Sequence, residues 1–402
     1  MLTVDAALDR LTHSLAAAKR LGADSADAIY VGDGSTGIGV RMGVLEDIGR
    51  SEGEEVGLRV FVGQRSASVS SSDLSVDALQ EAVERAVAMA REAPEDAYAG
   101  LAPAELLMHE TPRDLDIDDG GEISAEKLKD MALAAEDAAR AVAGVTNSEG
   151  GSASSGRAVM ALATSTGFAR GYHGTSYGVS ASVIAGEGTG MQRDYAYHSS
   201  RYATDLETPE SIGLRAGTRA VRRLGPIKLD TQSLPVVFDP RVGGGMLSAL
   251  IGAITGSSIA RKTSFLLDAM GTQVFAPGIR IIDQPHRLRG LRSKPFDGEG
   301  LPTAERAIID DGVLTGWLME SASARQLGLT PTGHAARGVS GPPGAGTSNL
   351  HMAAGSTSRA DMIGSIKYGL YVTEMIGMGV NGLTGDYSRG ASGCLIENGE
   401  LT

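Results

Sequence analysis

The 402-residue sequence is poor in cysteine and aromatic residues and has no long apolar segment. Its single cysteine, Cys394, cannot form an internal disulfide, which fits a reducing compartment. No apolar run approaches the roughly 18–20 residues that a membrane-spanning helix needs. The first five residues lack the basic and apolar parts of a secretion signal. We therefore expect a soluble, cytoplasmic protein without membrane association.

The sequence also lacks an excess of positive charge. Its formal net charge of −13 makes a nucleic-acid backbone an unfavourable partner. Glycine, in contrast, is abundant, with 55 residues, about twice the usual share. Because 42% of the residues are still hydrophobic, we read the glycines as marks of hairpins and bulges and not of disorder. The length predicts two or three domains.

The first 230 residues contain two blocks with the same order of expected elements: a helix, antiparallel strands and a second helix. The first block predicts helices over 4–21 and 79–90 around short strands between residues 28 and 70. The second predicts a helix from 125 to about 142 capped by Ser124, strands over 158–185, a polar loop over 195–201 and a helix over 211–223. An internal repeat, with two units that share or stack a sheet, is one hypothesis that fits this order.

We interpret residues 1–230 as an N-terminal α+β region, with possible subunits 1–93 and 122–225 joined by a linker over 94–121. Residues 231–402 are expected to form a β-rich C-terminal domain. Two hairpin signals lie there, Asp311-Gly312 and Asn398-Gly399. Only three residues follow Asn398-Gly399, so we expect the C-terminal end to be truncated or to pair with another chain. The expected fold class is α+β.

The stretch 234–265 has the outline of an active site. A short strand over 234–238, expected to be buried, precedes a presumed glycine turn at 243–245 and a helix with one apolar face. A phosphate-binding loop would need Lys-Ser or Lys-Thr at the helix start, and a metalloprotease helix would need two histidines and a glutamate. This helix has neither histidine nor carboxylate. We interpret it as a packing helix over a glycine turn, without metal ligands or catalytic groups.

Other motif matches favour structural roles. Gly174–Gly178 matches Gly-x-Ser-x-Gly by letters, but strand-like residues follow where the nucleophile elbow needs a helix, so we expect a turn serine. The serine of Ser124-Ala125-Glu126-Lys127 stands where a helix N-cap is expected. The seven histidines contain no pair with the i, i+2 or i, i+4 spacing of metal sites, which leaves open only a site assembled from distant segments. Cys394 is expected to be a buried small hydrophobic residue.

Two loops are richer in chemistry. Residues 333–344 form a glycine- and proline-rich segment that includes His334 and Arg337. Residues 385–390 place Asp386, Tyr387 and Arg389 within four positions. Loops of this composition often carry function, although a structural turn with an internal Asp–Arg pair would fit equally well.

Four segments carry a resemblance to a known family: Phe238-Asp239-Pro240-Arg241-Val242-Gly243-Gly244-Gly245, Phe275–Gly278, Gly290–Gly300, and the block from Gly369 to Gly399. They closely resemble the TldE-type members, without the His-Glu-x-x-x-His motif, of the TldD/PmbA family of metallopeptidases, once labelled modulators of DNA gyrase. The resemblance spans nearly the whole chain. It departs from the family at Gly393-Cys394-Leu395, where Gly-Phe-Trp is usual, and in the strands that the family has after this hairpin.

The resemblance implies an α+β N-terminal region, a barrel-like C-terminal domain and a cytoplasmic zinc metallopeptidase formed with a TldD-type catalytic subunit that cleaves unfolded peptides. The zinc belongs to that partner. Its motif aligns with Leu247–Gly252, where this chain has no ligand and no general base. The resemblance therefore predicts a non-catalytic subunit that shapes a peptide-binding chamber, and we expect His334, Arg337, Asp386, Tyr387 and Arg389 to line it. A homodimer is expected when the chain is alone.

Two alternatives remain open at this point. The chain could be a stand-alone binding protein for peptides or antitoxins, without part in hydrolysis. It could also be an independent hydrolase with a dispersed site. Copurification with a TldD-type partner separates the first alternative from the subunit hypothesis, and a metal bound to the lone chain would favour the second.

Overall fold

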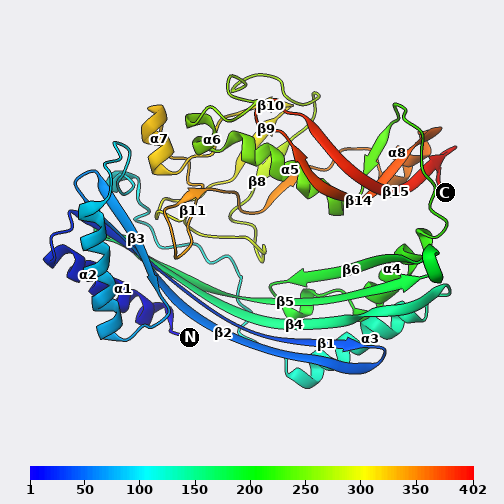
Figure 1. Cartoon of the computed structure of the whole chain (residues 1–402), viewed down its shortest axis with the longest axis horizontal. Coiled ribbons are helices and arrows are strands. Elements are labelled where there is room, and N and C mark those ends of the chain that lie inside the picture. Colours follow the sequence, from blue (N-terminus) through cyan, green and yellow to red (C-terminus); the bar gives the residue numbers. More distant parts are fainter.

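A six-stranded antiparallel sheet dominates the computed structural model, which describes residues 1–402 apart from the side chain of Met378. The strand order is β3-β2-β1-β4-β5-β6. Its members are β1 (Ser25–Arg41), β2 (Val44–Val62), β3 (Arg65–Ser71), β4 (Val145–Thr164), β5 (Ala169–Ala185) and β6 (Gln192–Ser200). The long strands bend the sheet into an arch with the C-terminal residues on its concave side (Figure 1).

Four helices cover the convex side of the sheet as two pairs. They are α1 (Val4–Arg20), α2 (Val76–Glu92), α3 (Ala125–Arg140) and α4 (Pro209–Arg222). The pair α1 and α2 lies over one end of the arch, and α3 and α4 lie over the other (Figure 1). Each pair encloses its own hydrophobic core against the strands. The predicted helices over 4–21 and from 125 are confirmed, and the Ser124 hydroxyl accepts a hydrogen bond from the Lys127 amide as an N-cap.

The chain therefore runs helix, three strands, helix twice, and the sheet order reads the same from both edges. The two halves meet at β1 and β4, which pair without interruption from Asp27↔Thr164 to Val40↔Gly151. This is the shared sheet that the repeat hypothesis required of two similar units. The division into domains itself stays a prediction.

Three expectations about the strands were wrong in detail. The four or five short strands expected between residues 28 and 70 merge into three long ones, because glycines such as Gly39 are accommodated inside the ladder by a bulge. The polar loop expected over 195–201 is mostly the edge strand β6, in which exposed Tyr195 and Tyr197 alternate with buried Asp194 and Ala196. Ser176 lies inside β5 and not in a turn.

Residues 94–121, expected as a linker, lie across the sheet with only one short helical turn, η1 (Ala104–Leu106). Leu107, Leu115 and Ile117 are buried, and the Met108 amide donates a hydrogen bond of 2.9 Å to the Gly300 carbonyl. Two further turns, η2 (Gly188–Gly190) and η3 (Ala203–Asp205), flank β6. The segment 94–121 therefore connects the sheet to the C-terminal residues.

The C-terminal residues combine short helices with three small sheets. The helices are α5 (Pro240–Ile254), α6 (Gly256–Ala260), α7 (Ser321–Leu327) and α8 (Arg359–Gly364). The strands are β7 (Val236–Phe238), β8 (Ile281–Asp283), β9 (Arg306–Asp310), β10 (Val313–Leu314), β11 (Ala335–Ala336), β12 (Gly344–Ala345), β13 (Leu350–Met352), β14 (Tyr368–Val380), β15 (Tyr387–Glu397) and β16 (Glu400–Leu401).

The sheet orders there are β10-β9-β8-β13, β11-β12 and β16-β15-β14-β7, and in the described residues none of these sheets closes into a barrel. Most of the strands have two to five residues, which is too short to surround a barrel interior. The predicted α+β class is confirmed.

Both predicted hairpins are confirmed. Asp311 and Gly312 have φ of 48° and 80°, and Asn398 and Gly399 have φ of 51° and 84°. These positive angles at both central residues are typical of the type I′ turn, which Asp-Gly and Asn-Gly favour. Each turn joins paired strands, β9 to β10 and β15 to β16.

A buried charge cluster, here called the buried clamp, joins the sheet to the C-terminal residues. It consists of Asp27 on β1, Arg59 on β2 and Arg337. Asp27 forms an ion pair with Arg337 and accepts hydrogen bonds from the Arg59 Nε at 3.2 and 3.3 Å. Burial alone would raise the pKa of Asp27, but the two guanidinium groups hold it below its usual value.

Candidate functional site

Helix α5 occupies the position that the sequence marked as an active-site outline. Asp239 caps it by accepting a hydrogen bond of 3.0 Å from the Arg241 amide, and Pro240 is its first residue. The presumed glycine turn was therefore wrong: Gly243–Gly245 lie within the helix. The cap and proline start the helix before the glycines, and Leu250, Ala253 and Ile254 bury its face in a core, which offsets the low helix propensity of glycine.

The strand before α5 was expected to be buried, and this was wrong as well. In β7, Val236 and Phe238 are 43% and 37% exposed. The strand lies at the edge of its sheet and pairs only with β14, in parallel. An edge strand of three residues leaves one side open to solvent.

The Asp239 carboxylate connects the start of α5 to its surroundings. Besides the α5 amide it accepts a hydrogen bond of 2.8 Å from the Tyr371 hydroxyl of β14. Burial alone would raise the pKa of Asp239, but these donors and the Arg241 charge hold it below its usual value. Burial and the neighbouring carboxylate raise the pKa of Tyr371. The site keeps a fixed negative charge at the helix N-terminus, where the helix dipole favours it.

Arg241 bridges α5 to the edge of the large sheet. Its guanidinium forms an ion pair of 2.7 Å with the buried Asp194 of β6 and lies 5.7 Å from the ring centroid of Tyr195. Two cavities adjoin this contact. One, of about 460 Å³, lies between β6, the start of α5, β14 and β15. The other, of about 680 Å³, lies between α4, the start of α5, α8 and β14.

A third cavity, of about 540 Å³, lies beside Leu247 and Ser248 of α5, the positions that align with the family's metal motif. Arg287, Arg292 and His351 contribute to its walls. Leu247 packs partly against the core behind it. The side chains on this face of α5 can bind by shape and hydrogen bonding, but aliphatic groups cannot coordinate a metal ion.

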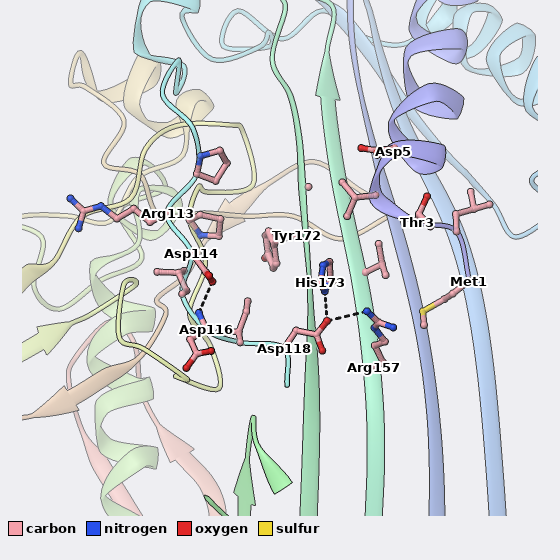
Figure 2. A pocket seen from close by; sticks show the side chains of 18 residues that line it. Met1, Thr3, Asp5, Arg113, Asp114, Asp116, Asp118, Arg157, Tyr172 and His173 are labelled. Atoms are coloured by element: carbon pink, nitrogen blue, oxygen red, sulfur yellow. Dashed lines mark hydrogen bonds and ion pairs between the residues drawn. The ribbon is translucent and has the colours of Figure 1, made fainter. Parts of the chain in front are cut away.

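The largest cavity, of about 840 Å³, lies between the N-terminus, residues 112–118 and the strands β4 and β5 (Figure 2). At its wall Asp118 forms ion pairs with His173 and, at 3.0 Å, with Arg157. Burial would raise the pKa of Asp118, but the Gly120 amide and the Arg157 charge hold it below its usual value. Figure 2 shows His173 and Arg157 directed to the same carboxylate from neighbouring strands. This arrangement ties residues 112–118 to the sheet, and no cysteine or serine hydroxyl is among the residues that line the cavity, all of which the structure describes.

The five residues predicted to line a peptide chamber lie in two different settings. His334 and Arg337 are buried: His334 contacts the Thr332 carbonyl at 2.8 Å through Nδ1 and lies 3.5 Å from Asp283, and Arg337 belongs to the buried clamp. Their positions are those of packing contacts between the sheet and the C-terminal residues.

The other three lie together at the start of β15. Tyr387 and Arg389 line the 460 Å³ cavity, with the guanidinium 5.2 Å from the ring centroid. Asp386 is exposed and accepts a hydrogen bond of 2.6 Å from Thr384. The Asp–Arg pair considered for this loop does not occur among the described contacts. The chamber-lining role of all five stays a prediction.

Sequence reasoning missed Asp194, Arg219 and Arg241 as members of one site. The signals were present but weak: Asp239-Pro240-Arg241 was read only as the end of a strand, and the basic end of α4 only as a helix terminus. The histidines remain scattered, and in the described part of the chain no three His, Cys, Asp or Glu side chains gather as a metal ion would require. No helix there is both long and apolar enough to cross a membrane.

Three family models together match most of the chain. They are described as PmbA/TldA metallopeptidase domain 1, central domain and C-terminal domain, and they match residues 26–90, 118–224 and 231–402. The metalloprotease PmbA of Escherichia coli O157:H7 is 40% identical over 99% of this chain and 87% of its own length. The PmbA homolog of Haemophilus influenzae is 37% identical over 90% of this chain and 79% of its own length.

Solved structures agree with these matches. A putative modulator of DNA gyrase from Bacteroides thetaiotaomicron superposes with a TM-score of 0.91 at 27% identity, over 100% of this chain and 89% of that one. TldE from Thermococcus kodakarensis superposes with a TM-score of 0.85 over 98% of this chain and 89% of its own, and at 19% identity it shows the shared fold alone. The chain therefore belongs to the PmbA/TldD metallopeptidase family.

Proposed function

We propose that this chain is a TldE-like subunit without metal chemistry of its own, which completes a peptide-binding chamber around the active site of a TldD-type partner. The single observation that carries the proposal is the side-chain set of α5. At Leu247–Gly252, the positions of the family's metal motif, the side chains are leucine, serine, alanine, leucine, isoleucine and glycine.

The zinc that the family implies does not fit this helix. Tetrahedral zinc needs imidazole, thiolate or carboxylate ligands. In α5 the corresponding face instead supports a core, where Leu250 and Ile254 are buried. We therefore assign no step of peptide hydrolysis to residues of this chain and place the zinc in the partner.

The chain's own contribution would be to bind and orient peptide. Three cavities surround the start of α5, and Tyr195, Tyr387 and the arginines among their walls offer flat apolar faces and hydrogen-bond donors. Such groups recognise extended chains without demanding one sequence. The cytoplasmic location expected from the sequence and the homodimer of the lone chain stay predictions.

The test is cleavage of an unfolded peptide by this chain alone, by a TldD-type partner alone and by the two together. We expect cleavage only in the mixture, and its loss when the partner is first treated with a chelator. Chelator-sensitive cleavage by this chain alone would contradict the proposal. Peptide binding without cleavage in any mixture would favour the stand-alone binding protein.

A further inference from the structure

The two cavities beside α4 contain more guanidinium groups than their carboxylates can neutralise. We call them together the arginine groove. They adjoin, since Asp194, Arg223, Arg241 and Thr373 line both. The arginines of the groove are Arg193, Arg215, Arg219, Arg222, Arg223, Arg241, Arg359 and Arg389, whereas its only acidic residues are Asp194, Asp239 and Glu374.

The acidic residues of the groove are already engaged. Asp194 pairs with Arg241 at 2.7 Å and with Arg223 at 3.7 Å, and Glu374 pairs with Arg223 at 2.6 Å. Arg193 and Arg215 pair with glutamates outside the groove. In the described residues this leaves four arginines of the groove without an ion pair: Arg219, Arg222, Arg359 and Arg389.

The unpaired arginines face one another across the larger cavity. Arg219 and Arg222 belong to the last turns of α4, and Arg359 begins α8 on the other wall, with its guanidinium 4.7 Å from the ring centroid of Tyr371. Burial, and then the charge of Arg241, lower the pKa of Arg219. Like charges held this close repel, and a bound anion would relieve the repulsion.

The local charge is opposite to that of the whole molecule, which carries −13. A cleft lined by one sign of charge concentrates ligands of the other sign. Arginine suits carboxylates in particular, because its planar group donates two parallel hydrogen bonds to them. The adjoining cavities, of about 460 and 680 Å³, continue past Tyr195 and Tyr387, which gives room for a chain and not only for a compact anion.

We propose that the arginine groove binds acidic stretches of extended peptides, with aspartate or glutamate carboxylates paired to Arg219, Arg222 and Arg359. The inference rests on the proposed function and adds a substrate class to it: peptides with clustered acidic residues are retained next to the start of α5. Neutral or basic peptides gain nothing from these arginines.

The test measures binding to the purified full chain by fluorescence anisotropy. The probe is a labelled peptide of about eight glutamates, roughly 26 Å long when extended, with a glycine-serine peptide of the same length beside it. We expect the glutamate peptide to bind more tightly, and the preference to fade as salt is raised. The double variant Arg222→Gln/Arg359→Gln should weaken binding by about tenfold for each arginine removed.

Arg85→Gln is the matched control, because Arg85 is exposed on α2, away from the groove, and forms no ion pair among the described residues. It should leave the affinity unchanged. Thermal unfolding should be the same for all variants, since the substituted side chains are exposed. Equal binding of the two peptides, an unaltered affinity in the double variant, or binding of inorganic pyrophosphate without binding of the glutamate peptide would each overturn the proposal.

Failure of this inference can be told apart from failure of the proposed function. Anisotropy uses this chain alone, and peptide cleavage uses the mixture with a TldD-type partner. Cleavage in the mixture without glutamate-peptide binding rejects the arginine groove as the peptide site and leaves the subunit role standing. Arginine-dependent binding without cleavage does the reverse.

Discussion

Two arginine-rich contacts join the large sheet to the C-terminal residues, and they differ in burial and in charge balance. In the buried clamp, Arg59 and Arg337 enclose the carboxylate of Asp27, and all three side chains are at most 7% exposed. In the arginine groove, Arg222 and Arg359 are exposed, and neither pairs with a described carboxylate. Buried charge must be paired to be tolerated, whereas exposed charge can wait for a ligand. The comparison separates arginines that hold the fold from arginines available for binding.

The largest expected effect is the loss of the carboxylate in the buried clamp. Asp27→Asn leaves two buried guanidinium groups without a counter-charge, and we expect the free energy of unfolding to fall by about 3–5 kcal/mol. Urea unfolding followed by circular dichroism measures it. Asp310→Asn is the matched control, because Asp310 forms an exposed ion pair of 2.9 Å with Arg280. Its cost should stay below about 1 kcal/mol, and a similar cost for both variants would contradict the comparison.

The same carboxylate predicts a pH dependence. Because the guanidinium groups lower the pKa of Asp27 from its ordinary value of 3.8, the folded state binds this proton less readily than the unfolded state. The stability from Asp27 is then complete above the unfolded pKa and is lost as the pH falls through the folded pKa. The difference in unfolding free energy between the native chain and Asp27→Asn should be constant between about pH 5 and 7 and shrink below about pH 4. A difference that shrinks already near neutral pH would indicate a raised pKa.

A smaller effect is expected at the cap of α5, next to the arginine groove. Tyr371→Phe removes the hydrogen bond to Asp239 and should lower the free energy of unfolding by about 1 kcal/mol. Tyr98→Phe is the control, since the described contacts give the hydroxyl of Tyr98 no hydrogen bond. The same urea titration compares them. If Tyr371→Phe cost as little as Tyr98→Phe, Asp239 would not depend on this donor for its position.

The smallest effect on stability is expected at the start of β15. Asp386→Asn and Arg389→Gln alter exposed or half-exposed side chains, so each should change the free energy of unfolding by less than about 0.5 kcal/mol. Cleavage of unfolded peptide by the mixture with a TldD-type partner should nevertheless decrease if this loop lines the chamber. Cleavage unchanged in both variants would remove residues 385–390 from that role.

Local signals in the sequence predicted most of the helices and both hairpins. Ser124 marked a helix start because its hydroxyl can bond the backbone three residues on, and Asn398-Gly399 marked a turn because both residues tolerate positive φ. The signals failed where the context is not local. Gly243–Gly245 favour a turn by themselves, but a cap before them and a core behind them make them helical. Tyr195–Ser200 look polar because only the buried side of β6 is apolar.

The sequence by itself determined the α+β class, the family, and the lack of metal ligands on α5, because each depends on residue types and spacing within one segment. Only the tertiary structure decided which arginines are paired. His334 and Arg337 looked like loop residues and are buried, while Arg219 and Arg222 looked like an ordinary helix end and line a cavity with Arg359. Charge balance depends on distances between residues far apart in the chain, and these are set by how the sheet and the C-terminal residues pack.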